Sequence, residues 1–263
     1  QASPDAPPAA AWPARHAAPN MTRTDGLDLL LRWTGISCDT EDARDHSLPH
    51  SLALLGDTGS GKSMLVRRMC AALWSDRGNP ATPLPVLLDG ARLAERTHAA
   101  LAAGGVPTLQ QLLAWAAADA GVPDLDPDAV LAAVHAGRAV VVCDGFDTLA
   151  LPLPRNRSMA LMRNLRAAAP QHSLGRLLVA ARTHFFLDAM DEEERLLAGE
   201  DTAEARGRAS GRVLAAYVEP FNNEQAAALA HRRAGRAAAE ALLDTLSGDP
   251  ALRDLGTRPG VLD

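Results

Sequence analysis

The sequence contains a single lysine, and that lysine follows a stretch rich in glycine. Of its 26 basic residues, 25 are arginine and only Lys62 is lysine. An ammonium group is a compact point charge on a flexible stem, which the planar guanidinium of arginine does not replace. Together with its neighbours the lysine matches the pattern G-x-x-x-x-G-K-[ST] in full, as Gly56-Asp57-Thr58-Gly59-Ser60-Gly61-Lys62-Ser63.

This pattern is typical of a loop that cradles phosphates. Its glycines allow a tight turn whose backbone N–H groups point inward, and a helix that begins at the loop adds the partial positive charge of its N-terminus. The Lys62 ammonium can reach the β- and γ-phosphates of a nucleotide, and the Ser63 hydroxyl can bind Mg²⁺. We therefore expect a nucleotide-binding segment made of Gly56, Asp57, Thr58, Gly59, Ser60, Gly61, Lys62, Ser63 and Met64.

Two aspartates follow an apolar segment with the composition of a buried strand. Residues 139–143 are alanine, three valines and cysteine, and Asp144 comes directly after them. Because ligands of parallel sheets bind at the carboxyl ends of the strands, we expect Asp144 beside Ser63 and the metal. Asp147 could orient or polarise the attacking water. Two other interpretations stay open here: Asp144 as a turn residue that ends the strand, and Asp147 as a helix N-cap.

Arg182 is a further candidate, because it comes directly after the apolar segment 177–181. A guanidinium at the end of that strand could contact the γ-phosphate and report which nucleotide is bound. The alternative is a structural ion pair.

The apolar periodicity predicts strands that alternate with helices, which implies a parallel sheet covered on both faces. A short helix is expected near residues 27–33, and the long interval between the second and third strands is largely helical. Residues 188–212 are highly charged and predict a solvated helix with a loop. The expected strands are 51–55, 84–88, 139–143, 176–181 and 213–218, and the other expected helices are 63–74, 108–120, 127–135, 157–168, 223–233 and 237–246.

Composition narrows the class of protein. The 263 residues suit one or two domains, and the net charge of −6 argues against a general binder of nucleic acid or anionic membranes. Three cysteines without C-x-x-C spacing favour a reducing, cytoplasmic setting, and no apolar run is long enough for a membrane helix. Residues 1–20 hold five prolines and eight alanines, which predicts a disordered linker. A start at Gln1 and a stop after a Pro-Gly turn suggest a piece of a longer protein.

Four segments together resemble the NACHT domains of STAND-type signalling NTPases, and the Arg-Thr-His-Phe-Phe run from Arg182 resembles bacterial members in particular. The resemblance covers residues 50–263, and Gly145, directly after Asp144, is a mark of the family. The four segments are the glycine-rich loop, Val140–Leu149 with Asp-Gly-Phe-Asp, Leu177–Phe186, and Tyr217–Phe221 with Glu224 and Gln225 after it.

The resemblance implies a three-layer α/β/α fold with a five-stranded, mainly parallel sheet of order 5-1-4-3-2. It implies Lys62 and Ser63 as phosphate and Mg²⁺ residues, and Asp144 as the metal carboxylate. It also implies Asp147 as the hydrolytic acidic residue, Arg182 as the sensor arginine, and Pro259 near the adenine. Family members often follow Asp147 with a second acidic residue. Here that residue is Thr148, which bears on the rate of hydrolysis.

The same resemblance implies a switch that binds ATP or ADP with Mg²⁺, hydrolyses ATP slowly and self-associates to activate an attached effector, for bacterial relatives commonly in defence against phage. Effector and sensor domains would lie outside this chain. The implied division is a linker at 1–20, a helical lead-in at 21–50, a nucleotide-binding domain at 51–220 and the start of a helical subdomain at 221–263. A mechanical AAA+-like ATPase that acts on a macromolecule is the alternative function, and a small-molecule kinase is a third.

Overall fold

The computed structural model describes residues 24–35, 48–151, 153–170, 172–185 and 213–248. The expected linker at 1–20, the charged segment 188–212 and Pro259 lie outside the described residues, so their predictions are not addressed by the structure.

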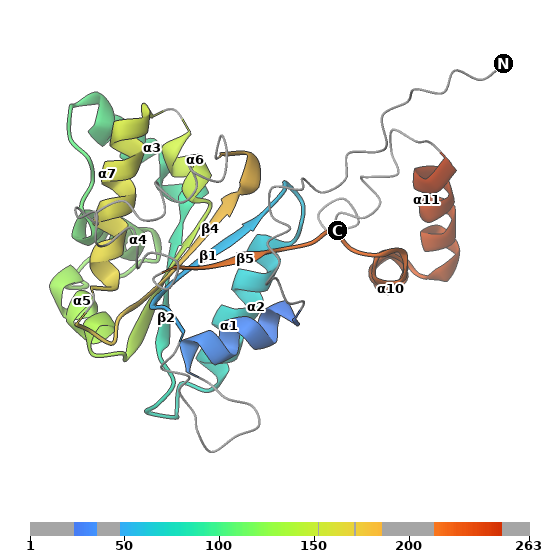
Figure 1. The fold of residues 1–263 in the computed structure, drawn as a ribbon, viewed down its shortest axis with the longest axis horizontal. Coiled ribbons are helices and arrows are strands. Elements are labelled where there is room, and N and C mark those ends of the chain that lie inside the picture. The colour runs from blue at the N-terminus through green and yellow to red at the C-terminus, as the bar shows by residue number, and fades with distance from the viewer. Residues whose placement is uncertain (1–23, 36–47, 152, 171, 186–212, 249–263) are drawn as a thin grey trace.

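A five-stranded parallel sheet forms the centre of the molecule (Figure 1). Its order, β2-β3-β4-β1-β5, is the expected order 5-1-4-3-2 counted from the other edge, so that prediction is confirmed. The glycine-rich loop follows the fourth strand in this row, and the segment with the two aspartates follows the second. The strands are β1 (Ser51–Gly56), β2 (Leu84–Asp89), β3 (Ala139–Asp144), β4 (Arg176–Arg182) and β5 (Val213–Tyr217).

Helices cover both faces of the sheet. One face packs against α1 (Gly26–Thr34) and α2 (Lys62–Ser75), and three helices fill the long interval between β2 and β3 on the other face. Two more helices of that second face follow β3. The helices of the second face are α3 (Gly90–Ala102), α4 (Leu109–Asp119), α5 (Pro127–His135), α6 (Phe146–Ala150) and α7 (Arg155–Leu165).

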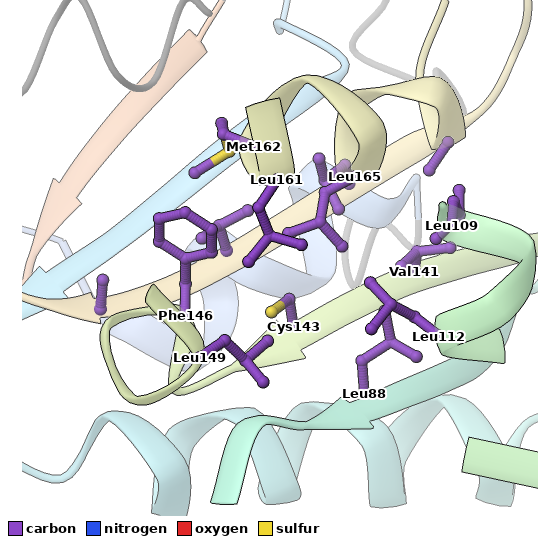
Figure 2. Packing of buried hydrophobic residues seen from close by; sticks show 14 of the residues in the cluster. Leu88, Leu109, Leu112, Val141, Cys143, Phe146, Leu149, Leu161, Met162 and Leu165 are labelled. Atoms are coloured by element: carbon purple, nitrogen blue, oxygen red, sulfur yellow. The ribbon is translucent and has the colours of Figure 1, made fainter. Parts of the chain in front are cut away.

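The alternation of side chains along each strand divides the core into two clusters. On β3, Val141 and Cys143 pack with the helices of the second face, whereas Val140 and Val142 pack with α1 and α2. Figure 2 shows the first cluster, where side chains of α4, α6 and α7 meet those of β2 and β3. Burial of β3 on both faces explains why its sequence is a continuous run of apolar residues, because neither face of the strand meets water.

Side chains cap α1, α3, α4 and α5, whereas α2 and α6 each begin after a glycine. Thr108 forms a capping box with Gln111 at the start of α4, and Asp126 caps α5. By contrast, α2 begins after Gly61 (φ 94°) and α6 after Gly145 (φ 86°), each without a hydrogen bond from a capping side chain. The N-terminal turn of α2 therefore keeps its backbone N–H groups free of a capping side chain.

Two helices near the end of the described chain, α10 (Asn223–Ala234) and α11 (Arg236–Gly248), pack on each other. That a separate helical subdomain begins at residue 221 stays a prediction. Within the ranges the structure describes, no helix has the length and apolar character to cross a membrane.

Candidate phosphate-binding site

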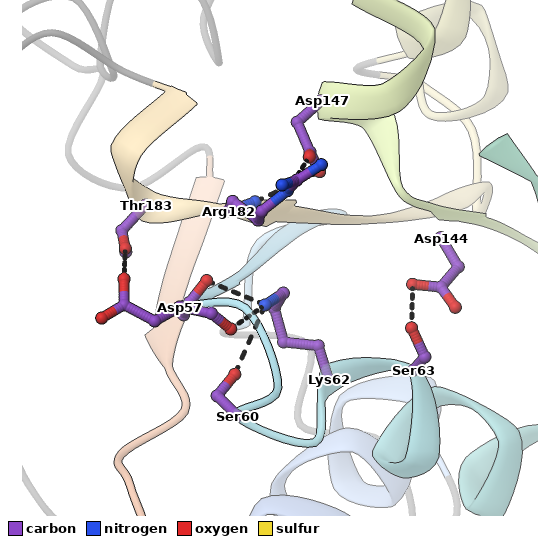
Figure 3. Close-up of polar contacts among 9 residues, drawn as sticks. Asp57, Ser60, Lys62, Ser63, Asp144, Asp147, Arg182 and Thr183 are labelled. Atoms are coloured by element: carbon purple, nitrogen blue, oxygen red, sulfur yellow. Dashed lines mark hydrogen bonds and ion pairs between the residues drawn. The ribbon is translucent and has the colours of Figure 1, made fainter. Parts of the chain in front are cut away.

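The candidate residues converge at the carboxyl ends of β1, β3 and β4 (Figure 3). Because β4 lies between β1 and β3, it brings the glycine-rich loop and the acidic segment to either side of its own end. Gly56 is the register partner of Arg182, and Asp144 is the partner of Ala180. Three segments far apart in the sequence therefore meet at one edge of the sheet, as expected for a ligand site in a parallel sheet.

The loop between β1 and α2 depends on its three glycines in two ways. Gly59 (φ 76°) and Gly61 (φ 94°) adopt left-handed conformations that other residues rarely tolerate. Gly56 is needed for space, because a Cβ there would lie 2.7 Å from Ser60 Oγ and 3.1 Å from the carbonyl oxygen of Val218. The glycine pattern thus follows from the shape of the loop itself.

Lys62 folds back over this loop. Its Nζ donates to the carbonyl oxygens of Gly56 and Asp57, each at 2.8 Å, and to Ser60 Oγ at 3.3 Å. Burial lowers the pKa of Lys62, while the negative charges of Asp147 and Asp57 oppose that shift. The ammonium is therefore positioned at the centre of the loop and surrounded by acidic groups.

Ser63 and Asp144 are in direct contact although 81 residues separate them, with Ser63 Oγ donating to Asp144 Oδ1 at 3.1 Å. Burial raises the pKa of Asp144, the Ser63 hydrogen bond opposes that rise, and the charge of Asp89 adds to it. A hydroxyl and a carboxylate are hard oxygen donors of the kind that Mg²⁺ takes from proteins alongside phosphates and waters. The pair therefore fits a magnesium ion.

Asp147 and Arg182 form an ion pair with each other. Asp147 lies in the first turn of α6, is 3% exposed, and accepts hydrogen bonds from the Arg182 backbone N at 3.3 Å and from its Nε. Gly145 holds the N-cap position of α6, so the N-cap interpretation of Asp147 is wrong. The structural ion pair that stood as the alternative for Arg182 is present.

The contacts of two aspartates in the site were not predicted from the sequence. Asp57 was expected to bind nucleotide, yet its carboxylate accepts a hydrogen bond from Thr183 Oγ1 at 2.8 Å. Asp89, the register partner of Asp144, ends β2 and caps α3 by accepting from the backbone N of Ala91. The rule that selected Asp144, an aspartate at the end of an apolar strand, also selects Asp89. No local signal pointed to Thr183, whose partner is 126 residues away.

Of the remaining expected residues, Thr58 lies in the loop and Met64 in the first turn of α2.

The chain is similar to a known protein family and to solved structures. The NACHT domain family model matches residues 50–235. No protein of curated function matches significantly. Among solved structures, a STAND protein (signal transduction ATPase with numerous domains) with a tetratricopeptide repeat sensor from Pyrococcus horikoshii is 13% identical, with a TM-score of 0.35 over 81% of this chain and 26% of its own. Cdc6p from Pyrobaculum aerophilum is 16% identical, with a TM-score of 0.39 over 82% and 48%. The chain spans less than half the length of either protein.

The matched segment contains all five strands, the glycine-rich loop, the Ser63–Asp144 contact and the Asp147–Arg182 pair. The chain therefore belongs to the NACHT domain family of STAND-type P-loop NTPases, a family of nucleotide-binding domains.

Proposed function

We propose that this domain binds ATP together with Mg²⁺, hydrolyses ATP slowly, and signals through the difference between its ATP and ADP forms. The observation that carries the proposal is the Ser63–Asp144 contact next to Lys62, at the uncapped N-terminus of α2. A positive charge, free helix amides and two hard oxygen donors together suit a triphosphate and its metal better than any other ligand class.

Each residue has a distinct task in this proposal. Lys62 and the first-turn amides of α2 neutralise the phosphates, while Ser63 and Asp144 hold Mg²⁺, which supplies further neutralisation of phosphate charge when bound. Asp147 orients water, and Arg182 contacts the third phosphate. The last two tasks require Asp147 and Arg182 to exchange the ion pair that they now form for other partners. That requirement, and Thr148 in place of a second acidic residue, support slow hydrolysis.

The signalling part of the proposal follows from linkage. A nucleotide shifts an equilibrium between two arrangements only by its differential affinity for them. We propose that the ATP form self-associates and activates an effector attached elsewhere in the full protein. The resemblance of the Arg182–Phe186 segment to bacterial members supports defence against phage as the setting.

Replacing the lysine tests nucleotide binding. Lys62→Ala removes the central charge, which we expect to weaken binding of an ATP analogue with Mg²⁺ by about 2–5 kcal/mol, roughly 30-fold to several thousandfold in Kd. Arg68→Ala is the matched control, because it removes one positive charge from an exposed position of the same helix. Isothermal titration of the 263-residue chain gives both affinities. Equal affinities of Lys62→Ala and the unchanged chain would refute the proposal.

Turnover and association test the switch. Single-turnover hydrolysis with retention of ADP, and a larger mass by light scattering with a non-hydrolysable ATP analogue than with ADP, are expected. Fast turnover that a protein or nucleic acid stimulates would contradict the switch and favour a mechanical ATPase.

A further inference from the structure

Two consecutive residues at the end of β4, Arg182 and Thr183, form hydrogen bonds to two different parts of the site (Figure 3). Arg182 bonds to Asp147 on α6, through both its backbone N and its Nε. Thr183, the next residue, donates from Oγ1 to Asp57 Oδ1 of the phosphate loop at 2.8 Å. Strand β4 is thus attached at its tip to the acidic segment on one side and to the loop on the other.

The contact at Thr183 extends the pairing of the sheet into the loop. Gly56 and Arg182 are register partners at the ends of β1 and β4, and the residue that follows each strand continues the contact through its side chain. Asp57 joins two groups at once, because its backbone oxygen accepts from Lys62 Nζ at 2.8 Å and its carboxylate accepts from Thr183. Hydrogen bonds to Asp57 and Asp147, together with the peptide bond between Arg182 and Thr183, therefore connect Lys62 to Asp147.

We propose that Thr183 is a positioning residue that sets the preference of the site for ATP over ADP, an inference that rests on the proposed function. Through its bond to Asp57, Thr183 fixes the place of Arg182 relative to the loop that carries Lys62. These two side chains are the cations that would read the third phosphate, the group in which ATP and ADP differ. A residue that fixes their relative placement acts on discrimination between the nucleotides, without touching either.

Loss of the Thr183 hydroxyl has two physical consequences. Thr183, which follows Arg182 directly, no longer forms its hydrogen bond to Asp57. The Arg182 guanidinium is therefore held less firmly where the third phosphate would lie. In addition, the Asp57 carboxylate loses the hydrogen bond from Thr183, and Lys62, whose pKa already senses the charge of Asp57, is a cation close enough to compensate. The first effect acts on the third phosphate alone, and the second acts on the β- and γ-phosphates that Lys62 can reach, so contacts to the third phosphate weaken most.

The experiment compares Thr183→Val with Thr183→Ser and with the unchanged chain. The Kd of a non-hydrolysable ATP analogue and the Kd of ADP, both with Mg²⁺, are measured by titration. We expect the ratio of Kd for ADP to Kd for the analogue to fall about 5- to 10-fold in Thr183→Val and to return in Thr183→Ser, which keeps the hydroxyl. Thr34→Val is the matched control, because the Thr34 hydroxyl donates to the Leu31 carbonyl at 2.7 Å in α1, away from the loop.

A purely structural contact gives a different result. Equal weakening of both nucleotides in Thr183→Val, or no change in either, overturns the inference. Asp57→Ala breaks the same hydrogen bond from the other end and should lower the ratio similarly, with no further fall in the double variant, so the inference stays falsifiable should Thr183→Val fold poorly. If the unchanged chain binds neither nucleotide, or if Lys62→Ala binds as well as it does, the proposed function fails; a normal response to Lys62→Ala with an unaltered ratio in Thr183→Val refutes this inference alone.

Discussion

The ion pair between Asp147 and Arg182 should respond very differently to the loss of either partner. The Asp147 side chain is 4% exposed, whereas that of Arg182 is 35% exposed. Arg182→Met leaves a carboxylate buried without its cation, but Asp147→Asn leaves a guanidinium that can reach water and an amide that can still accept from the Arg182 backbone N. Loss of the arginine should therefore destabilise the domain more.

The expected magnitudes follow from this difference in burial. Leaving a buried charge without its partner costs about 3–5 kcal/mol, so Arg182→Met should cost that much. Asp147→Asn should cost about 1–2 kcal/mol, the usual effect of weakening hydrogen bonds while a solvated cation remains. At roughly 2–4 °C per kcal/mol for a domain of this size, Tm should fall by about 10 °C in the first variant and by about half of that or less in the second.

Thermal unfolding of the nucleotide-free chain, followed by calorimetry in EDTA, measures these shifts. Arg96→Met is the matched control, because Arg96 pairs with Asp119 at 2.6 Å but both side chains are more exposed, at 44% and 22%. This exposed pair should be worth about 1 kcal/mol or less. The double variant Arg182→Met with Asp147→Asn should be more stable than Arg182→Met alone. Equal Tm values for Arg182→Met and Arg96→Met, or a larger loss in Asp147→Asn, would refute the reasoning.

Three further predictions concern the loop, the metal carboxylate and the packing behind it. Because Lys62 is the only lysine in the sequence and burial lowers its pKa, an amine-reactive ester should modify Lys62 at a lower pH than an ordinary lysine. ATP with Mg²⁺ should slow this labelling by about tenfold or more, as measured by mass spectrometric peptide mapping. Labelling of Lys62 that ATP does not change would contradict this prediction. Because burial raises the pKa of Asp144 above its usual 3.8, the chain should lose stability as the pH rises from 3.8 through the raised value. Asp144→Asn should therefore raise Tm at pH 7 by a few degrees, and nucleotide affinity should no longer depend on Mg²⁺. A lower Tm, or intact Mg²⁺ dependence, would count against this prediction. Gly90→Ala should lower the free energy of unfolding by about 3 kcal/mol or more, because its Cβ would lie 2.3 Å from the Gly145 carbonyl oxygen. The control Gly78→Ala, whose Cβ would have no atom within 4 Å, should change it by about 0.5 kcal/mol or less. Equal denaturation midpoints for the two variants would argue against this packing.

Local features of this domain were open to prediction because each depends on a short stretch of chain. The loop at 56–63 needs glycines for its left-handed residues and, at Gly56, for the close approach of Ser60 and Val218. These glycines can be recognised directly in the sequence. The run 139–144 is apolar because both of its faces are buried, so its strand and the aspartate that ends it could be located. The contact between Ser63 and Asp144 then followed from the rule that parallel strands place their carboxyl ends at one edge.

Only the tertiary structure decided which partner each side chain takes at that edge. The N-cap interpretation of Asp147 is wrong because a glycine caps α6, and the neighbouring strand supplies Arg182 as the ion-pair partner of Asp147. Asp57 turns its carboxylate to Thr183, and Asp89 lies beside Asp144, because the strand order places those residues together. A charged group can pair with any opposite partner that the fold brings near, and sequence periodicity carries no information about distances between segments 35 to 126 residues apart.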